Sequence, residues 1–132
     1  MGMIKGLAEI VLNVRDQAAA LRFYRDVFEL EVISPPERPG PIFLQVGPAQ
    51  VGIPQMIVLV PLVLESAAFV LPRTLHHLAL TVAPADFDAL EARLHALGYA
   101  TRDGQHPVIP ARTFYVNDPD GNEVEIICST TA

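Results

Sequence analysis

Two segments of the chain repeat the same order of hydrophobic and polar positions. Each begins with alternating apolar and polar residues, as in a strand with one buried face. Each continues, after a short turn, with apolar residues spaced along one side of a helix. The segments are AEIVLNVRDQAAALRFYRDVFELEV and HHLALTVAPADFDALEARLHALGYA. The repetition predicts two modules of the same kind.

The first strand of each segment has an apolar face that must pack against the following helix. Because side chains alternate along a strand, Glu9 and Asn13 lie on the other face of the first strand. His77 and Thr81 lie on the corresponding face of the second. Glu9 and His77 occupy equivalent positions in the two copies.

The two helices carry start and stop signals. Asp16 stands where an N-cap is expected, and Pro84 opens the second helix, where its missing N–H costs nothing. Gly98 is a natural helix stop. The second helix has a predicted buried stripe formed by Phe87, Leu90, Leu94 and Leu97.

Three short strand-like runs follow each helix, separated by proline- and glycine-rich segments. They cover residues 31–34, 42–46 and 56–60 in the first copy and residues 99–102, 113–116 and 123–128 in the second. We therefore expect one α+β domain over residues 1–132. Its first βαβββ module spans about residues 1–63, its linker residues 64–73, and its second module residues 74–132.

The last strand adds a second carboxylate to the open face. Val124, Ile126 and Cys128 form an apolar face that should pack on the helix, so Glu125 points to the open side with Glu9 and His77. A buried carboxylate is costly without an opposite charge. One imidazole and two carboxylates are suitable ligands for a divalent ion. His77 as a structural histidine and Glu125 as a strand-edge carboxylate are the alternatives.

Composition restricts the partners. The chain has 132 residues, 51% hydrophobic and 18% charged, which suits a folded protein. A net charge of -6 without a basic cluster argues against nucleic acid. The single cysteine, Cys128, gives no sign of an oxidising compartment. The apolar stretch 51–71 is interrupted by prolines and polar residues, which argues against a membrane span. We expect a cytoplasmic protein.

Several motifs resemble the vicinal oxygen chelate superfamily, which includes glyoxalase I, extradiol dioxygenases, fosfomycin-resistance proteins and bleomycin-binding proteins. They are EIVLNVRD, FYRDVFELEV, HHLALTV, FDALEARLHALGY and FYVNDPDGNEVEI, which together cover most of the chain. The resemblance implies a cupped, mostly antiparallel sheet with the helices outside, and commonly a homodimer. It also implies metal ligands at Glu9, His77 and Glu125. A fourth ligand position, in the last strand of the first module, offers only Gln55 and Met56.

The ligand set predicts the kind of ion. In the superfamily that the chain resembles, histidine is commoner than glutamate at the position of Glu9. A ligand set with two carboxylates favours Mg²⁺ or Mn²⁺ over Zn²⁺. Without a metal, Glu9 and Glu125 could act as a catalytic acid–base pair. The residues expected to line a substrate site are Asn13, Thr81, Tyr115, Gln55 and Met56.

Two main functions follow from these expectations. The first is a metal-dependent lyase, isomerase or dioxygenase acting on a small molecule with adjacent oxygens. The second is a non-catalytic binding protein of the bleomycin-resistance kind, which holds a small ligand without a metal. A dimeric scaffold whose cup is filled by side chains is the third alternative.

Overall fold

A computed structural model describes residues 3, 5–62 and 75–131 of the chain. The chain divides into two compact units, Met1–Val70 and Leu71–Ala132, which we call the N-terminal and the C-terminal module. Each module is described by itself. The predicted linker, residues 64–73, lies outside the described residues, and the predicted boundaries at residues 63 and 74 stay a prediction.

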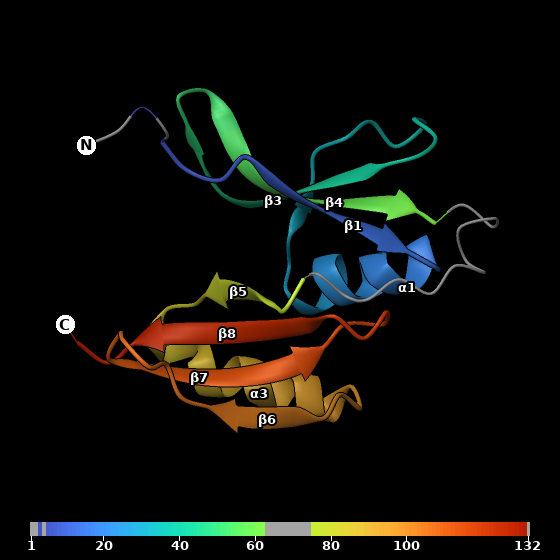
Figure 1. The fold of residues 1–132 in the computed structure, drawn as a ribbon. Coiled ribbons are helices and arrows are strands. Elements are labelled where there is room, and N and C mark those ends of the chain that lie inside the picture. Colours follow the sequence, from blue (N-terminus) through green and yellow to red (C-terminus); the bar gives the residue numbers. More distant parts are fainter. Residues whose placement is uncertain (1–2, 4, 63–74, 132) are drawn as a thin grey trace. The chain divides into compact units, whose positions relative to one another are not determined.

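The N-terminal module follows the predicted order of elements (Figure 1). In sequence they are β1 (Glu9–Val14), α1 (Gln17–Leu21), the π-helix η1 (Arg22–Val27), β2 (Glu31–Val32), β3 (Ile42–Gln50) and β4 (Ile53–Pro61). The strand order in the sheet is β1-β4-β3-β2. β1 and β4 are parallel, whereas β3 is antiparallel to both β4 and β2.

The C-terminal module repeats this architecture. Its elements are β5 (Leu78–Thr81), the 3-10 turn η2 (Pro84–Asp86), α3 (Phe87–Ala96), β6 (Thr101–Gly104), β7 (Ala111–Asn117) and β8 (Glu123–Ser129). The strand order is β5-β8-β7-β6, again with one parallel pair, β5 and β8, and two antiparallel pairs. The predicted α+β class with two βαβββ modules and mostly antiparallel pairing is confirmed.

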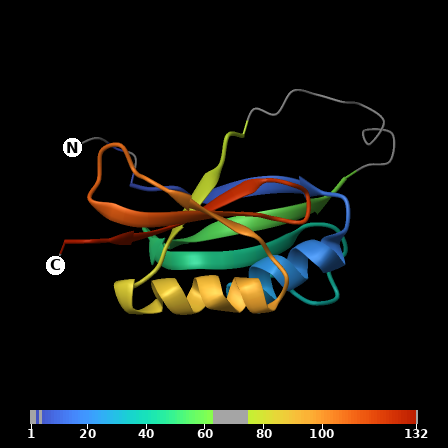
Figure 2. The ribbon, with the colours of Figure 1, turned by 90° about the horizontal axis from the view of Figure 1, so that it is seen from below.

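In each module the helices cover one face of the sheet and leave the other face open within that module (Figures 1 and 2). The contacts run from α1 to β4 and from α3 to β6 and β8. Strand parity agrees with the sequence analysis, since Leu12 and Val14 are buried whereas Glu9 and Asn13 are exposed. None of the described helices is long and apolar enough to cross a membrane.

Aromatic side chains anchor both helices. Phe23 and Tyr24 are completely buried although they are neighbours in sequence, and their rings meet edge to face with centroids 5.0 Å apart. In the C-terminal module, Phe87 of α3 packs on Phe114 of β7 at 5.2 Å. Edge-to-face contacts of this kind add to the gain from burying apolar surface. The Phe87 contact joins α3 to its sheet, whereas Phe23 and Tyr24 both belong to η1.

The β3–β4 hairpin is longer than predicted. The sequence indicated strands at 42–46 and 56–60 with a loop between them, but the ladder continues to the two-residue turn Val51–Gly52. Both turn residues have positive φ, 51° and 80°, as in the turns that match the twist of a hairpin. The pairing shifts around Gly47 absorb the extra residues as bulges.

Helix α3 ends as predicted but buries less of its stripe. Gly98 has a φ of 90°, and its N–H donates to the carbonyl of His95, which closes the helix. Phe87 and Leu94 are buried, whereas Leu97 is 57% exposed. The prediction for Leu97 was wrong because α3 ends at Ala96, so the helical periodicity no longer directs the next side chain to the sheet.

Candidate functional site

The open face of the C-terminal sheet carries most of its polar chemistry. Along β8, Val124 and Ile126 are fully buried on the side that α3 covers. Glu123 and Glu125 alternate with them and therefore point to the open face. β7 lies beside β8 with Tyr115 opposite Glu125, so the tyrosine shares this face.

His77 and Glu125 lie together on this face. The imidazole Nε2 of His77 is 3.1 Å from the carboxylate Oε1 of Glu125. The Glu125 side chain is 5% exposed and that of His77 is 31% exposed, so the imidazole connects a buried carboxylate to the surface. The pairing of β5 with β8 sets this geometry, because Ala79 lies beside Glu125 and His77 directly precedes β5.

Two further rings complete the surroundings of His77. The Nδ1 atoms of His76 and His77 are 2.7 Å apart, which requires a shared hydrogen bond. The Tyr115 ring meets the His77 ring at 5.6 Å with an angle of 76°. Burial raises the pKa of Tyr115 above its usual 10.0, and the charges of Glu125 and Glu123 raise it further. The tyrosine therefore keeps its O–H, and its ring lies against the imidazole of His77.

A second polar group lies one step along the same face. Arg102 of β6 donates through Nη2 to Asn117 Oδ1 at 3.1 Å and to Glu123 Oε1 at 3.0 Å. Arg102 is paired with Tyr115 across the sheet, so the guanidinium group belongs to the same surface. Arg102 and His76 were not predicted from the sequence; the register of the β6–β7 hairpin is the signal that would have pointed to the arginine.

Thr113 is a buried polar residue on this face. Its Oγ1 is buried without a hydrogen-bond partner among the described residues. A Cβ on the neighbouring Gly104 would collide with this oxygen and would lie 2.5 Å from the Tyr115 ring. Gly104 thus leaves room for the side chains of Thr113 and Tyr115. The predicted residue Thr81 is exposed at the end of β5, opposite Ile127.

The predicted residues of the N-terminal module occupy a different setting. Glu9 and Asn13 are exposed on β1, opposite Met56 and Val60 of β4. Met56 shares the open face, whereas Gln55 has the opposite strand parity and its amide lies over Gly47. Among the described residues, no three His, Cys, Asp or Glu side chains are grouped to hold a metal.

Comparing the two modules locates the counterpart of Glu125. Ile10 pairs with Ile57 in one sheet as Leu78 pairs with Val124 in the other. The position equivalent to Glu125 is therefore Val58, which is 2% exposed. The N-terminal module thus keeps a carboxylate at the position of His77 but places an apolar side chain at that of Glu125.

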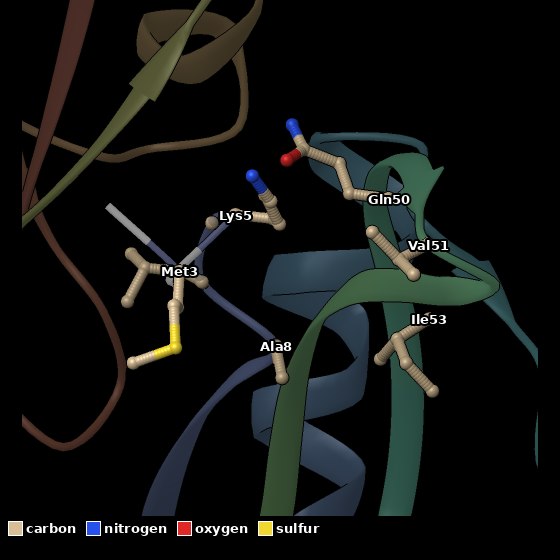
Figure 3. A pocket seen from close by; sticks show the side chains of 8 residues that line it. Met3, Lys5, Ala8, Gln50, Val51 and Ile53 are labelled. Carbon is tan, nitrogen blue, oxygen red and sulfur yellow. The ribbon is translucent and has the colours of Figure 1, made fainter. Parts of the chain in front are cut away.

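A cavity of about 300 Å³ lies at the tip of the N-terminal sheet (Figure 3). Most of its lining comes from the segment before β1 and from the turn of the β3–β4 hairpin, including Met3, Lys5, Ala8, Gln50, Val51 and Ile53. None of the site residues predicted from sequence lines this cavity. Its walls are mainly apolar side chains, with polar groups from Lys5 and Gln50.

Comparison with known proteins identifies the family. Residues 6–126 match the model of the Glyoxalase/Bleomycin resistance protein/Dioxygenase superfamily, so the chain belongs to this superfamily. The match covers both modules, including His77 and Glu125. A search of curated protein sequences gave no match.

Solved structures share the fold. The fosfomycin resistance protein FosX from Listeria monocytogenes is 23% identical and has a TM-score of 0.70, with 97% of this chain and 96% of that chain covered. A glyoxalase/dioxygenase from Nostoc punctiforme is 22% identical, with a TM-score of 0.73 and coverage of 98% and 94%. TnmS3, an antibiotic binding protein from Streptomyces sp. CB03234, is 24% identical, with a TM-score of 0.66 and coverage of 98% and 100%. These likenesses show the same fold.

Proposed function

We propose that the protein binds a divalent metal through His77 and Glu125 and acts on a small oxygen-rich molecule at that position. The observation that supports this is the approach of His77 Nε2 to Glu125 Oε1 at 3.1 Å. One donor is an imidazole and the other a carboxylate that is almost completely buried. Burying that charge is costly unless a positive charge or a strong hydrogen bond compensates for it.

The distance between the two ligand atoms, His77 Nε2 and Glu125 Oε1, fits coordination of a single ion. Two ligand atoms about 2.1 Å from one ion and at a right angle to each other are about 3 Å apart. The separation of 3.1 Å matches this spacing. The same separation is that of the direct hydrogen bond, so an ion would replace that hydrogen bond between the two side chains.

Glu9 is the proposed third ligand, since it occupies the position equivalent to that of His77. A set of two carboxylates and one imidazole favours Mg²⁺ or Mn²⁺ over Zn²⁺. A bound ion of this kind would polarise and orient adjacent oxygens of a substrate. The chain's own residues would bind and orient that substrate, with the Tyr115 hydroxyl as a neutral donor and Arg102 as a positive charge on the same face.

The remaining predicted residues differ in whether they lie on the faces that carry the proposed ligands. Thr81 shares the face of Glu125, and Asn13 and Met56 share the face of Glu9. Gln55 has the opposite strand parity to Met56, so we propose no contact with substrate for it. Glu9 and Glu125 as a metal-free acid–base pair remain the catalytic alternative, with lyase, isomerase or dioxygenase chemistry as the classes expected of an enzyme.

Equilibrium dialysis of the purified full chain against Mn²⁺ tests the metal proposal. We expect one ion per chain, and we expect Glu125→Gln or His77→Gln to weaken binding at least about tenfold, since even loss of an outer partner costs 10- to 100-fold. Glu123→Gln, the same change two residues away on the same face, serves as the control and should bind nearly as well. Equal binding by all four proteins would refute the role of the pair.

A second function is favoured by the open face of the N-terminal sheet. Val11 is 52% exposed there, and Val58 and Phe43 are its apolar neighbours across β4 and β3. Of these three side chains Val11 is exposed, Phe43 is half-buried and Val58 is buried, and a partly exposed apolar face suits a binding protein that holds an aromatic or aliphatic ligand. In that function the protein sequesters a small molecule without a metal, as the bleomycin-resistance name within the superfamily suggests.

Binding of metal-free bleomycin separates the two functions. The sequestering function predicts binding that withstands His77→Ala and Glu125→Ala but weakens when Val11→Asp places a charge on the apolar face. Val108→Asp, at a similarly apolar exposed residue of the C-terminal module, is the matched control. Failure to bind bleomycin, together with one Mn²⁺ per chain, would favour the metal-dependent function.

A further inference from the structure

Three side chains form one continuous chain of hydrogen bonds in the C-terminal module. His76 Nδ1 lies 2.7 Å from His77 Nδ1, and His77 Nε2 lies 3.1 Å from Glu125 Oε1. The two imidazole rings meet at 5.0 Å with an angle of 69°. His76 is exposed and Glu125 is buried, so the chain connects solvent to a buried carboxylate.

The positions of the protons in this chain follow from simple counting. A neutral imidazole has one N–H and one bare nitrogen. An ionised Glu125 only accepts, so His77 must carry its proton on Nε2 and leave Nδ1 bare. The short contact between the two Nδ1 atoms then requires His76 to carry its proton on Nδ1. With neutral imidazoles and an ionised carboxylate, this is the arrangement that satisfies both hydrogen bonds.

A metal at His77 needs the opposite arrangement. Coordination through Nε2 requires that atom to be bare, so a neutral His77 must carry its proton on Nδ1. The partner at Nδ1 must then accept a hydrogen bond instead of donating one. A backbone carbonyl or a carboxylate would suit only this second state, whereas a histidine can supply either a donor or an acceptor at the same nitrogen.

We propose that His76 is a positioning residue that sets the tautomer of His77 and so controls whether Nε2 is available to a metal. This inference rests on the proposed function. Between the two states, one proton leaves His77 Nε2 for solvent and one passes from His76 Nδ1 to His77 Nδ1. A third arrives from solvent at His76 Nε2, so neither imidazole becomes charged and the proton count is unchanged.

The exposure of His76 makes this exchange feasible, because its Nε2 side can take a proton directly from water. Partners behind a metal-bound histidine usually change metal affinity 10- to 100-fold. Here we expect the same range for the loss of His76. Residues 75–77 precede β5, so strand parity does not fix the direction of His76, and its ring meets that of His77.

Long-range ¹H–¹⁵N correlation spectra of the histidine rings in the full chain test the metal-free state. We expect His77 to carry its proton on Nε2 and His76 on Nδ1. Addition of Mg²⁺, which is diamagnetic, should move the proton of His77 to Nδ1 and that of His76 to Nε2. A metal-free spectrum with His76 protonated only on Nε2 would overturn the inference without involving any metal.

The Mn²⁺ affinity of His76 variants provides the second part of the test. His76→Phe keeps a ring without a donor or acceptor and should weaken Mn²⁺ binding about 10- to 100-fold. His76→Gln, whose amide can donate or accept, should recover most of that loss, which a merely structural role for the ring would not predict. If wild type binds Mn²⁺ and His76→Phe binds it equally well, the inference about His76 fails while the proposed metal-binding function stands. If wild type binds no Mn²⁺, the proposed function fails and the inference with it.

Discussion

Glu125 lies on a strand whose other face is wholly apolar, and its side chain is 5% exposed. A buried charged group that loses its partner costs about 1–3 kcal/mol or more. His77 supplies that partner at 3.1 Å, and the Tyr115 ring packs against the His77 ring. At the scale of residues, the contact with His77 therefore compensates for the burial of the Glu125 carboxylate on β8.

Val51 offers a test of backbone strain at a single residue. It has a φ of 51° at the turn of the β3–β4 hairpin, and its side chain is 83% exposed. A β-branched residue in the left-handed region is strained by roughly 1–2 kcal/mol, whereas asparagine followed by glycine suits this turn. Val51→Asn should therefore raise the free energy of unfolding by about 1 kcal/mol in urea denaturation.

Val108→Asn is the control for this change. Val108 is 82% exposed, so the two substitutions remove nearly the same amount of exposed apolar surface. Val108 does not have a positive φ, and asparagine should give no comparable gain there. Stabilisation of equal size by both variants would mean that surface polarity, and not relief of strain, explains the result.

At the scale of elements, Arg112 ties β7 to helix α3. Its Nη2 donates to Asp88 Oδ1 at 2.8 Å, and its guanidinium group lies 4.3 Å from the centre of the Phe87 ring. This hydrogen bond, followed by the charge of Arg112, lowers the pKa of Asp88 below its usual 3.8. Asp88 also lies in the first turn of α3, where a negative charge suits the helix dipole.

The lowered pKa of Asp88 gives a pH dependence with a definite sign. Its contribution to stability is present above the unfolded pKa of 3.8 and is lost as pH falls through the lower folded pKa. Asp88→Asn should therefore destabilise the protein slightly at pH 7, because the pair is exposed, and have less effect at pH 2. A difference in unfolding free energy that grows on acidification would contradict this.

The boundaries of elements were predictable where a residue has a specific local role. Gly98 ends α3 because glycine accepts a φ of 90°, and strand parity correctly assigned the two faces of β1 and β8. The length of the β3–β4 hairpin was not predictable, since Val51 is an unusual turn residue and Gly47 marks a bulge. The turn at Val51 and the bulge at Gly47 depend on how β3 pairs with β4 and not on the local pattern of apolar and polar residues.

At the scale of the whole molecule, the two modules share a fold but not their chemistry. Glu9 and His77 are equivalent, yet the partner of His77 is Glu125, whereas the N-terminal position equivalent to Glu125 holds Val58. The sequence predicted His77, Glu125 and Glu9 from parity and resemblance. It did not predict His76, which precedes β5 and so is not placed by strand parity, or Arg102, which reaches Glu123 through the register of β6 with β7. The homodimer and the cytoplasmic location stay predictions.

The most direct test of the central claim is to detect the His77 nitrogen on a bound ion. Electron spin-echo modulation of Mn²⁺ bound to the full chain should contain a ¹⁴N signal from one imidazole. That signal should disappear in His77→Gln and persist in His95→Gln, which changes an exposed histidine on α3. A bound Mn²⁺ without nitrogen modulation, or with a signal that survives His77→Gln, would contradict the account.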